Sequence, residues 1–265
     1  MNILIIAVNY NSYDELTRYL QSLDMSARSC EKCHVSVAIS DNSDINCQYE
    51  FPTVECLELR YVKNDNLGYF GGVSAIYNKC KDIGEFDYVI ISNVDIVVPT
   101  DFFTKLMQHQ NMPDEAWIAN RIWSIAEKRD RNPKILDRCS KTKLKIQRTL
   151  YKYPFLDFIY TNTLYRRKGI QEEAPAREIY AGHGSFIILT KAFTNHFASI
   201  DYPIFLFGEE IFLAELIRNA KLRVTYDPTI VVNDIEHTST GKMKKKSYYK
   251  YNLESIEYIL NTFYE

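Results

Sequence analysis

The feature that most constrains the fold is an alternation of short apolar runs with helical segments in the first hundred residues. Strands are predicted over residues 3–8, 35–39, 57–62 and 88–91, and the first of them is a continuous apolar run, typical of a strand buried on both faces of a parallel sheet. After the first run, an apolar stripe at helical spacing is formed by Leu16, Tyr19, Leu20 and Leu23. This alternation predicts an α/β fold with a parallel sheet.

Polar side chains stand where three of these predicted strands end. Asn9 ends the first strand, Asp41 the second, and Asn93 with Asp95 the fourth. Ligands of open α/β sheets bind outside the carboxyl ends of the strands, so these side chains predict a ligand site at one edge. Asp95 alone has two interpretations: it caps the following turn and helix, or it holds a divalent cation through its carboxylate oxygens.

A glycine-rich turn, Asn-Leu-Gly-Tyr-Phe-Gly-Gly at residues 66–72, precedes a helix predicted over 72–80. Such a turn lets the backbone approach a ligand closely, and a helix N-terminus favours anions. The turn matches neither a Walker A loop nor the dinucleotide fingerprint. Taken alone, it is interpreted as a structural turn.

Two adjacent carboxylates, Glu209 and Glu210, open a helix predicted over 209–220. The helix dipole by itself favours acids at this position. In the functional interpretation one carboxylate is a general base, and the other binds a hydroxyl or orients its neighbour. His237 follows an acidic run and is either a metal ligand or an ordinary surface residue. His183 is a second candidate metal ligand, but for this residue an ordinary structural role is favoured more strongly than for His237.

Charge is distributed unevenly. Residues 121–169 hold 14 basic and four acidic residues, although the net charge of the whole chain is −2. The same stretch is rich in aromatic residues, among them Tyr151, Tyr153, Phe155, Phe158, Tyr160 and Tyr165. This composition suits contact with an anionic membrane surface or a phosphorylated acceptor, and equally a solvated helical insertion. Nucleic acid is disfavoured as a partner, because no binding motif accompanies the charge.

The last third returns to the α/β pattern. Strands are predicted over 185–189, 222–226 and 230–232, and a terminal helix over 247–263. That helix is expected to turn inward the side chains of Tyr248, Tyr251, Ile256, Ile259 and Leu260.

The six cysteines and the hydropathy indicate a compartment. Cys30-x-x-Cys33 is a lone motif without a second pair to complete a zinc site, and we expect all six thiols to be reduced and non-functional. No segment approaches the roughly 18 apolar residues that a membrane span requires. The predicted location is the cytoplasm.

In combination these signals resemble a known family. The chain is similar to the inverting family 2 glycosyltransferases that use nucleotide-diphospho-sugars, and most of all to the rhamnosyltransferase-like branch of bacterial surface polysaccharide synthesis. The resemblance is carried by segments in the family's order: 8–12, 41–43, 66–72, 93–95, 184–185, 205–210, 226–228 and His237. Each segment is weak alone, but eight in the correct order form a specific signal.

The resemblance implies a GT-A fold, in which a Rossmann-like nucleotide half and an acceptor half share one mixed sheet. The single domain 1–265 would comprise a nucleotide-sugar half at 1–100, an acceptor half at 101–240 with the basic insertion 121–169, and a C-terminal helix at 241–265.

The resemblance also implies residue roles. Val8 and Asn9 would lie by the base and ribose, Asp41 would accept from the imide N–H of uracil or thymine, and Asn66, Gly71 and Gly72 would flank the nucleotide and sugar. Residues 93–95 match the family's D-x-D motif, so that Asp95 with His237 would bind Mn²⁺ or Mg²⁺. Glu210 matches the catalytic base, and Glu209 would contact hydroxyls of the donor or acceptor.

Three positions depart from the family pattern. Asn93 replaces the first acid of D-x-D, Glu210 replaces an Asp, and Tyr251-Asn252 replaces a late Arg-Asn pair. The motif of processive synthases is absent, which favours transfer of a single sugar. Glu is one methylene longer than Asp but belongs to the same pKa class, so activity is expected to survive.

The predicted function is metal-dependent, inverting transfer of one sugar from a dTDP- or UDP-sugar to a hydroxyl of a glycan or lipid-linked acceptor. The location would be cytoplasmic, with peripheral contact at the inner face of the cell membrane through the basic insertion. Two alternatives stay open at this point: a catalytically degenerate module that binds nucleotide sugar, and a nicotinamide-dependent dehydrogenase.

Overall fold

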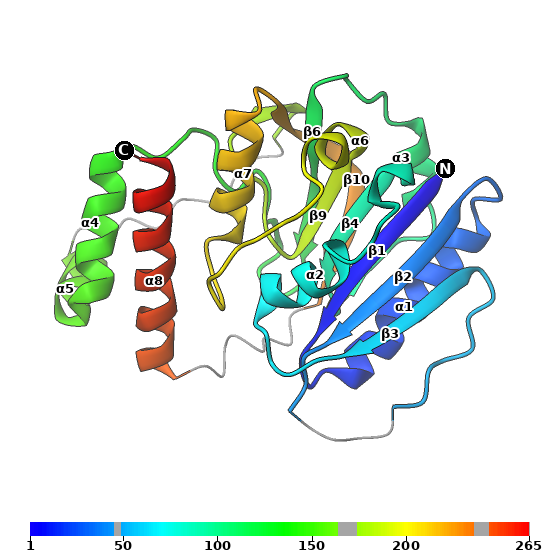
Figure 1. Ribbon diagram of the computed structural model, residues 1–265, viewed down its shortest axis with the longest axis horizontal. Helices are drawn as coiled ribbons and strands as arrows, with labels where there is room; N and C mark the ends of the chain where they lie inside the picture. The colour runs from blue at the N-terminus through cyan, green and yellow to red at the C-terminus, as the bar shows by residue number, and fades with distance from the viewer. Residues whose placement is uncertain (45–48, 164–173, 236–243, 265) are drawn as a thin grey trace.

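The computed structural model describes residues 1–44, 49–163, 174–235 and 244–264, without the side chains of 159–163. One mixed sheet of ten strands runs through it (Figure 1), with the central order β3-β2-β1-β4-β9-β6-β10-β5. The four strands predicted first are β1 (Asn2–Asn9), β2 (His34–Asp41), β3 (Leu57–Lys63) and β4 (Tyr88–Asn93). They pair in parallel, which confirms the predicted sheet.

The second half of the sheet is mixed. β9 (Phe186–Thr190) runs antiparallel to both β4 and β6 (Glu115–Ser124), and β6 pairs in parallel with β10 (Arg223–Asp234). The short strands β5 (Ile96–Val97) and β8 (Arg177–Ile179) pair with β10, and β7 (Arg129–Asp130) pairs with β6. The predicted mixed sheet is therefore present.

Alternating strand residues feed two cores, one on each face of the sheet. Ile3 and Ile5 of β1 point into the core covered by α1 (Tyr13–Arg28) and α3 (Phe102–Gln108). Leu4 and Ile6 point into the opposite core. That second core is covered by α2 (Tyr69–Tyr77), α6 (Lys191–His196), α7 (Glu209–Asn219) and α8 (Lys245–Phe263). A short 3-10 helix, Ile83–Glu85, precedes β4.

Several predicted boundaries were wrong for identifiable reasons. α2 begins at Tyr69 rather than at residue 72, because Gly68, at φ 75°, already turns the chain before the first helical residue. The two strands predicted over 222–226 and 230–232 form one strand, β10, interrupted by an irregularity between Asp227 and Val231. β6 was missed: its polar end, from Arg121 onward, had been assigned to the basic insertion.

The insertion is only partly helical. After β7 the chain forms α4 (Lys141–Lys152) and α5 (Pro154–Thr163), and α4 packs against α8 at one end of the molecule (Figure 1). In α8, Ile256, Ile259 and Leu260 are buried as predicted. Tyr248 is 41% exposed, so its predicted inward orientation was wrong. Its ring lies on the surface against Phe207 rather than in the core.

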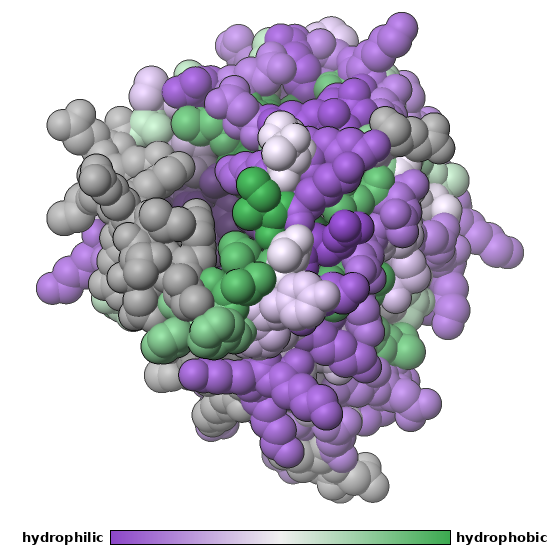
Figure 2. Space-filling view, turned by 90° about the vertical axis from the view of Figure 1, so that its left-hand side faces the viewer, coloured by the Kyte–Doolittle hydropathy of each residue, from purple (hydrophilic) through white to green (hydrophobic). Residues whose placement is uncertain are grey.

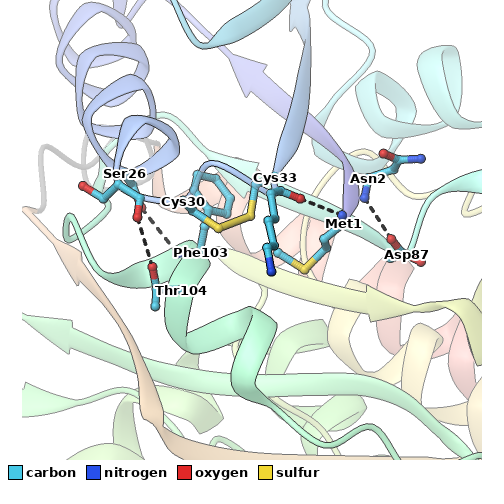
Figure 3. Close-up of a disulfide and its surroundings, with 10 residues drawn as sticks. Met1, Asn2, Ser26, Cys30, Cys33, Asp87, Phe103 and Thr104 are labelled. Atoms are coloured by element: carbon cyan, nitrogen blue, oxygen red, sulfur yellow. Dashed lines mark hydrogen bonds between the residues drawn. A yellow bond between two sulfur atoms is a disulfide. The ribbon is translucent and has the colours of Figure 1, made fainter.

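Cys30 and Cys33 form a disulfide, which corrects the expectation of six reduced thiols (Figure 3). The pair lies after the C-terminus of α1, near Phe103 of α3. A turn in which Cys33 N donates to Cys30 O at 2.9 Å holds the two Cα atoms 5.6 Å apart, within the usual range for a disulfide. Among the described residues, Cys56, Cys80 and Cys139 are free thiols.

Candidate functional site

The carboxyl ends of β1, β2 and β4 meet at one edge of the sheet, and their polar residues converge there. Asn9 is in register with Asp41, and Val8 lies between Ser40 and Asn93. Parallel pairing with this register brings together side chains that are up to 85 positions apart in the sequence. The predicted convergence of Asn9, Asp41 and Asn93 at the sheet edge is confirmed.

Asp41 is fully buried and saturated with hydrogen bonds. Its carboxylate accepts from five side chains of β1, α1, β3 and the loop after β2: Asn9, Ser43, Tyr13, Tyr61 and Lys63. Burial alone would raise the pKa of Asp41, but these donors outweigh it and lower the pKa to about 2. A ligand N–H could reach Asp41 only after one of these donors had moved.

The glycine-rich turn is packed tightly against the strand ends. Gly68 lies so close to Phe205 that a Cβ at this position would be 2.1 Å from the Phe205 carbonyl oxygen. A Cβ on Gly72 would be 2.8 Å from Asn42 Nδ2. Asn66 accepts a hydrogen bond from Gly68 N at 3.3 Å, and Asn42 donates to Gly68 O at 2.8 Å. These contacts explain why the turn needs Gly68 and Gly72. Ligand contacts of Asn66, Gly71 and Gly72 stay a prediction.

Asp95, just beyond β4, is largely enclosed. Its Oδ1 atom is buried and has no hydrogen-bond partner. Burial, followed by the charge of Asp234, raises the pKa of Asp95 to about 6. A divalent cation fits this environment, because it would supply the missing partner and carboxylate oxygens suit Mg²⁺ and Mn²⁺. The described part of the chain has no group of three or more candidate metal ligands, and His237 lies outside the described residues.

Glu209 and Glu210 form the first turn of α7, after Gly208 in the left-handed conformation at φ 83°. The chain can pass here only without a side chain, because a Cβ on Gly208 would lie 1.9 Å from Ser255 Oγ. Both carboxylates point toward Gly184. A Cβ there would be 3.2 Å from Oε1 of Glu210 and 3.3 Å from Oε1 of Glu209. Burial, followed by the charge of Glu210, raises the pKa of Glu209 well above its usual range.

Tyr69 connects the two parts of the site, and the sequence analysis missed it. Its hydroxyl donates to the Gly184 carbonyl oxygen at 2.8 Å. Burial and then the charges of Glu209, Asp95 and Glu210 raise the pKa of Tyr69 well above its usual value. One phenol at the start of α2 is therefore within electrostatic range of all three carboxylates. The signal available in the sequence was its place inside the glycine-rich turn.

Lys134 is a second missed residue. Its Nζ atom lies 3.6 Å from Oε1 of Glu210. In the sequence it was one of 14 basic residues in the insertion, with nothing to mark it out. Asp227, part of the matched segment 226–228, instead belongs to the scaffold. His109 Nδ1 lies 2.7 Å from its Oδ2 atom, and His109 Nε2 lies 2.9 Å from Glu115 Oε2.

Comparison with known proteins shows similarity in structure but no detectable similarity in sequence. No protein-family profile matches the chain, and no curated protein is detectably similar to it. A mannosyltransferase from Pyrobaculum calidifontis, solved with GDP-Man and Mn²⁺, aligns with a TM-score of 0.52 at 11% identity over 98% of this chain and 70% of its own.

Two further structures share the fold. GalNAc-T7 with UDP, GalNAc and Mn²⁺ aligns with a TM-score of 0.56 at 10% identity, over 92% of this chain and 45% of its own. TarS from S. aureus gives a TM-score of 0.53 at 9% identity, over 100% of this chain and 44% of its own. The chain thus spans less than half the length of these two proteins. The fold is that of the GT-A glycosyltransferases, as predicted.

Proposed function

We propose that the protein is a glycosyltransferase that moves one sugar from a nucleotide-diphosphate donor to an acceptor hydroxyl. One observation carries this proposal: Glu209 and Glu210 lie against Gly184, whose carbonyl oxygen accepts a hydrogen bond from Tyr69, and Tyr69 is within electrostatic range of both glutamates and of Asp95. The three structural neighbours support it at the level of the fold, and two of them were solved with Mn²⁺.

The paired carboxylates divide the acid–base work. Burial and the charge of Glu210 raise the pKa of Glu209, and Glu209 is proposed to contact a hydroxyl of the donor or acceptor. Glu210, whose Oε1 atom lies 3.6 Å from Lys134 Nζ, is proposed to take the proton of the attacking acceptor hydroxyl. Attack from the face opposite the leaving diphosphate inverts the anomeric carbon.

The donor is held at the strand-end edge. Val8, Asn9, Asn66 and Asn93 are proposed to contact the nucleotide, with Asp41 fixing the edge on which it rests. Asp95 would hold Mn²⁺ or Mg²⁺, with His237 as a further ligand, and the cation would neutralise charge on the diphosphate. The dTDP- and UDP-sugars are the first donor candidates. A rhamnosyltransferase-like role in surface polysaccharide synthesis is the finer proposal, and it rests on the sequence resemblance.

A membrane surface is the proposed setting for the acceptor, which would be a glycan or a lipid-linked sugar. Figure 2 shows hydrophobic surface among hydrophilic residues on the side of the molecule that holds α4 and α5. Phe155 is 71% and Phe158 66% exposed, in a segment whose lysines, such as Lys152, suit anionic lipid. No helix within the described ranges is both long and apolar enough to cross a bilayer.

The proposed function is tested by the thermal stability of the protein with UDP, dTDP, GDP or NAD, each with and without Mn²⁺. A ligand that binds only the folded state raises the melting temperature by mass action. Stabilisation by UDP or dTDP that requires Mn²⁺ is the expected result, and transfer to an acceptor then completes the test. Stabilisation by NAD alone would contradict the proposal. Donor binding without transfer to any acceptor would identify a nucleotide-sugar-binding module instead.

A further inference from the structure

A positively charged cavity of about 700 Å³ opens beside the proposed catalytic base. Among the described residues, its wall carries five cationic and two acidic side chains, namely Arg129, Arg131, Lys134, Arg138 and Lys143 against Glu127 and Asp137. None of the strand-end residues proposed to hold the donor is part of the cavity wall, so the cavity is available to the acceptor. This charge is not needed to bind the donor in the proposed function.

The cavity adjoins Glu210 through three of its wall residues. Lys134 places Nζ 3.6 Å from Oε1 of Glu210. Ile211 directly follows Glu210 in α7, and His183 directly precedes Gly184, whose Cα faces the same carboxylate. A hydroxyl at Glu210 and an anionic group in the cavity can therefore belong to one acceptor molecule.

The cations of the wall fall into two groups. The three arginines are already paired with carboxylates: Arg131 with Asp234 at 3.1 Å, Arg138 with Glu215 at 2.7 Å, and Arg129 with Glu127. Lys134 is 40% exposed, and its ion pair with Glu210 is long, at 3.6 Å. In the described part of the chain no carboxylate lies within ion-pairing distance of Lys143. Lys143 therefore supplies charge that no described carboxylate compensates, and Lys134 supplies charge held only by a long ion pair with Glu210.

His183 lines the cavity as a neutral ring. Burial, followed by the charges of Lys134, Arg131 and Arg129, lowers the pKa of His183 well below its usual value. Ser185 donates its backbone N–H to His183 Nδ1 at 3.2 Å, so the neutral ring carries its hydrogen on Nε2.

We propose that this cavity is the acceptor subsite for a phosphate ester. Lys134 and Lys143 bind the phosphate or diphosphate of the acceptor, and its sugar hydroxyl reaches Glu210. Charged hydrogen bonds from lysine to phosphate oxygens are among the stronger polar contacts in proteins. This inference rests on the proposed transferase function and names the chemical class of its acceptor.

Inorganic pyrophosphate is the probe for the test, with calorimetric titration of the full chain in EDTA so that no divalent metal contributes. Binding to the wild-type protein is expected, and Lys143→Gln and Lys134→Gln should each weaken it about threefold to tenfold. Lys145→Gln is the matched control, since Lys145 is exposed on the same helix but is not part of the cavity wall. It should leave the affinity unchanged.

Three results would overturn the subsite: no binding in EDTA, no weakening by either lysine substitution, or equal weakening by Lys145→Gln. Glycerol phosphate and phosphatidylcholine vesicles containing phosphatidic acid then distinguish a soluble from a lipid-borne ester. The measurement needs no donor, so the two proposals fail separately. Donor stabilisation without pyrophosphate binding overturns only the subsite, whereas pyrophosphate binding without donor stabilisation overturns the transferase assignment and leaves a phosphate-ester site.

Discussion

The strand-end cluster around Asp41 and the carboxylate cluster around Glu209 and Glu210 both contain buried carboxylates, but their surroundings shift the carboxylate pKa in opposite directions. Asp41 accepts hydrogen bonds from five side chains, and these lower its pKa to about 2. Glu209 is enclosed beside a second carboxylate, and its pKa is raised. The first arrangement stabilises the ionised form and fixes the backbone. The second keeps a proton available, which proton transfer to or from a substrate requires.

The largest expected effect concerns the carboxylate cluster. Glu210→Gln removes the proposed base while it keeps the size of the side chain, and transfer should fall about 10²- to 10⁴-fold. Donor stabilisation in the thermal assay should persist, because the change leaves the strand-end edge intact. Initial rates of sugar transfer measure the effect, with Glu254→Gln, on the partly exposed Glu254 of α8, as the control. Normal turnover by Glu210→Gln would show that Glu210 is not the base.

Asp41→Asn probes the opposite cluster through stability. The substitution removes the charge that Tyr61, Lys63 and Tyr13 stabilise, and should lower the free energy of unfolding at neutral pH by about 2 to 3 kcal/mol. Because the folded-state pKa of Asp41 is depressed, its contribution is full above the unfolded value near 4. It is lost as pH falls through about 2.

Urea denaturation from pH 7 down to the acid limit checks this prediction. The stability curves of wild type and Asp41→Asn should approach each other as pH falls through the pKa of Asp41. Glu58→Gln, exposed near the start of β3 and away from the strand ends, is a suitable control. A constant difference between wild type and Asp41→Asn down to the lowest pH would mean that the ionised carboxylate is not what stabilises this cluster.

Substitution of one glycine beside each cluster should have effects of intermediate size. The substitution at Gly72 should lower stability, and the one at Gly184 should slow transfer. A Cβ on Gly72 would press on Asn42 and Ser40, so Gly72→Ala should cost about 1 to 3 kcal/mol of stability. A Cβ on Gly184 would press on the ends of two flexible carboxylates. Gly184→Ala should therefore leave stability nearly unchanged and slow transfer. Melting temperature and transfer rate are measured on both variants. A stable Gly72→Ala protein together with an unstable Gly184→Ala protein would contradict the comparison.

The sequence alone predicted the strand-end cluster better than the carboxylate cluster. Strand ends can be located from short apolar runs, so the meeting of Asn9, Asp41 and Asn93 follows once the strands are parallel. The partners of Asp41 could not be predicted, because Tyr13 and Tyr61 look like ordinary core tyrosines among 20 tyrosines. The sequence marked Glu209 and Glu210 as paired carboxylates at a helix start, and the resemblance assigned the base to Glu210. It did not supply Tyr69 or Lys134, which reach the pair only through the packing of α2 and the insertion.

The insertion was harder to interpret, because its basic composition gave no indication that it begins within a strand. Arg121 and the three residues after it continue β6, yet they were assigned to the basic insertion on composition alone. A strand with a polar end has no continuous apolar run to reveal it. An anionic partner was one of the two interpretations of this composition, and the proposed subsite beside Glu210 names residues that would bind it, Lys134 and Lys143.

The smallest expected effect concerns the outer face of the insertion, far from both clusters. Phe155→Ser removes an exposed aromatic ring from α5 and should weaken binding to phosphatidylserine-containing vesicles about threefold to tenfold, since partial burial of one aromatic ring in the lipid interface is lost. Met25→Ser, at a residue 52% exposed on α1 at the other end of the molecule, is the matched control and should have no effect.

Vesicle sedimentation at low and high salt separates the two contributions to this binding. Added salt should release wild type and Phe155→Ser alike, because it screens the lysines and leaves the apolar contact unaffected. If wild type does not sediment at low salt, the outer face of the insertion does not bind membrane. The cavity beside Glu210 would then be the only part of the insertion that is proposed to bind an anionic ligand. That ligand would be a soluble acceptor.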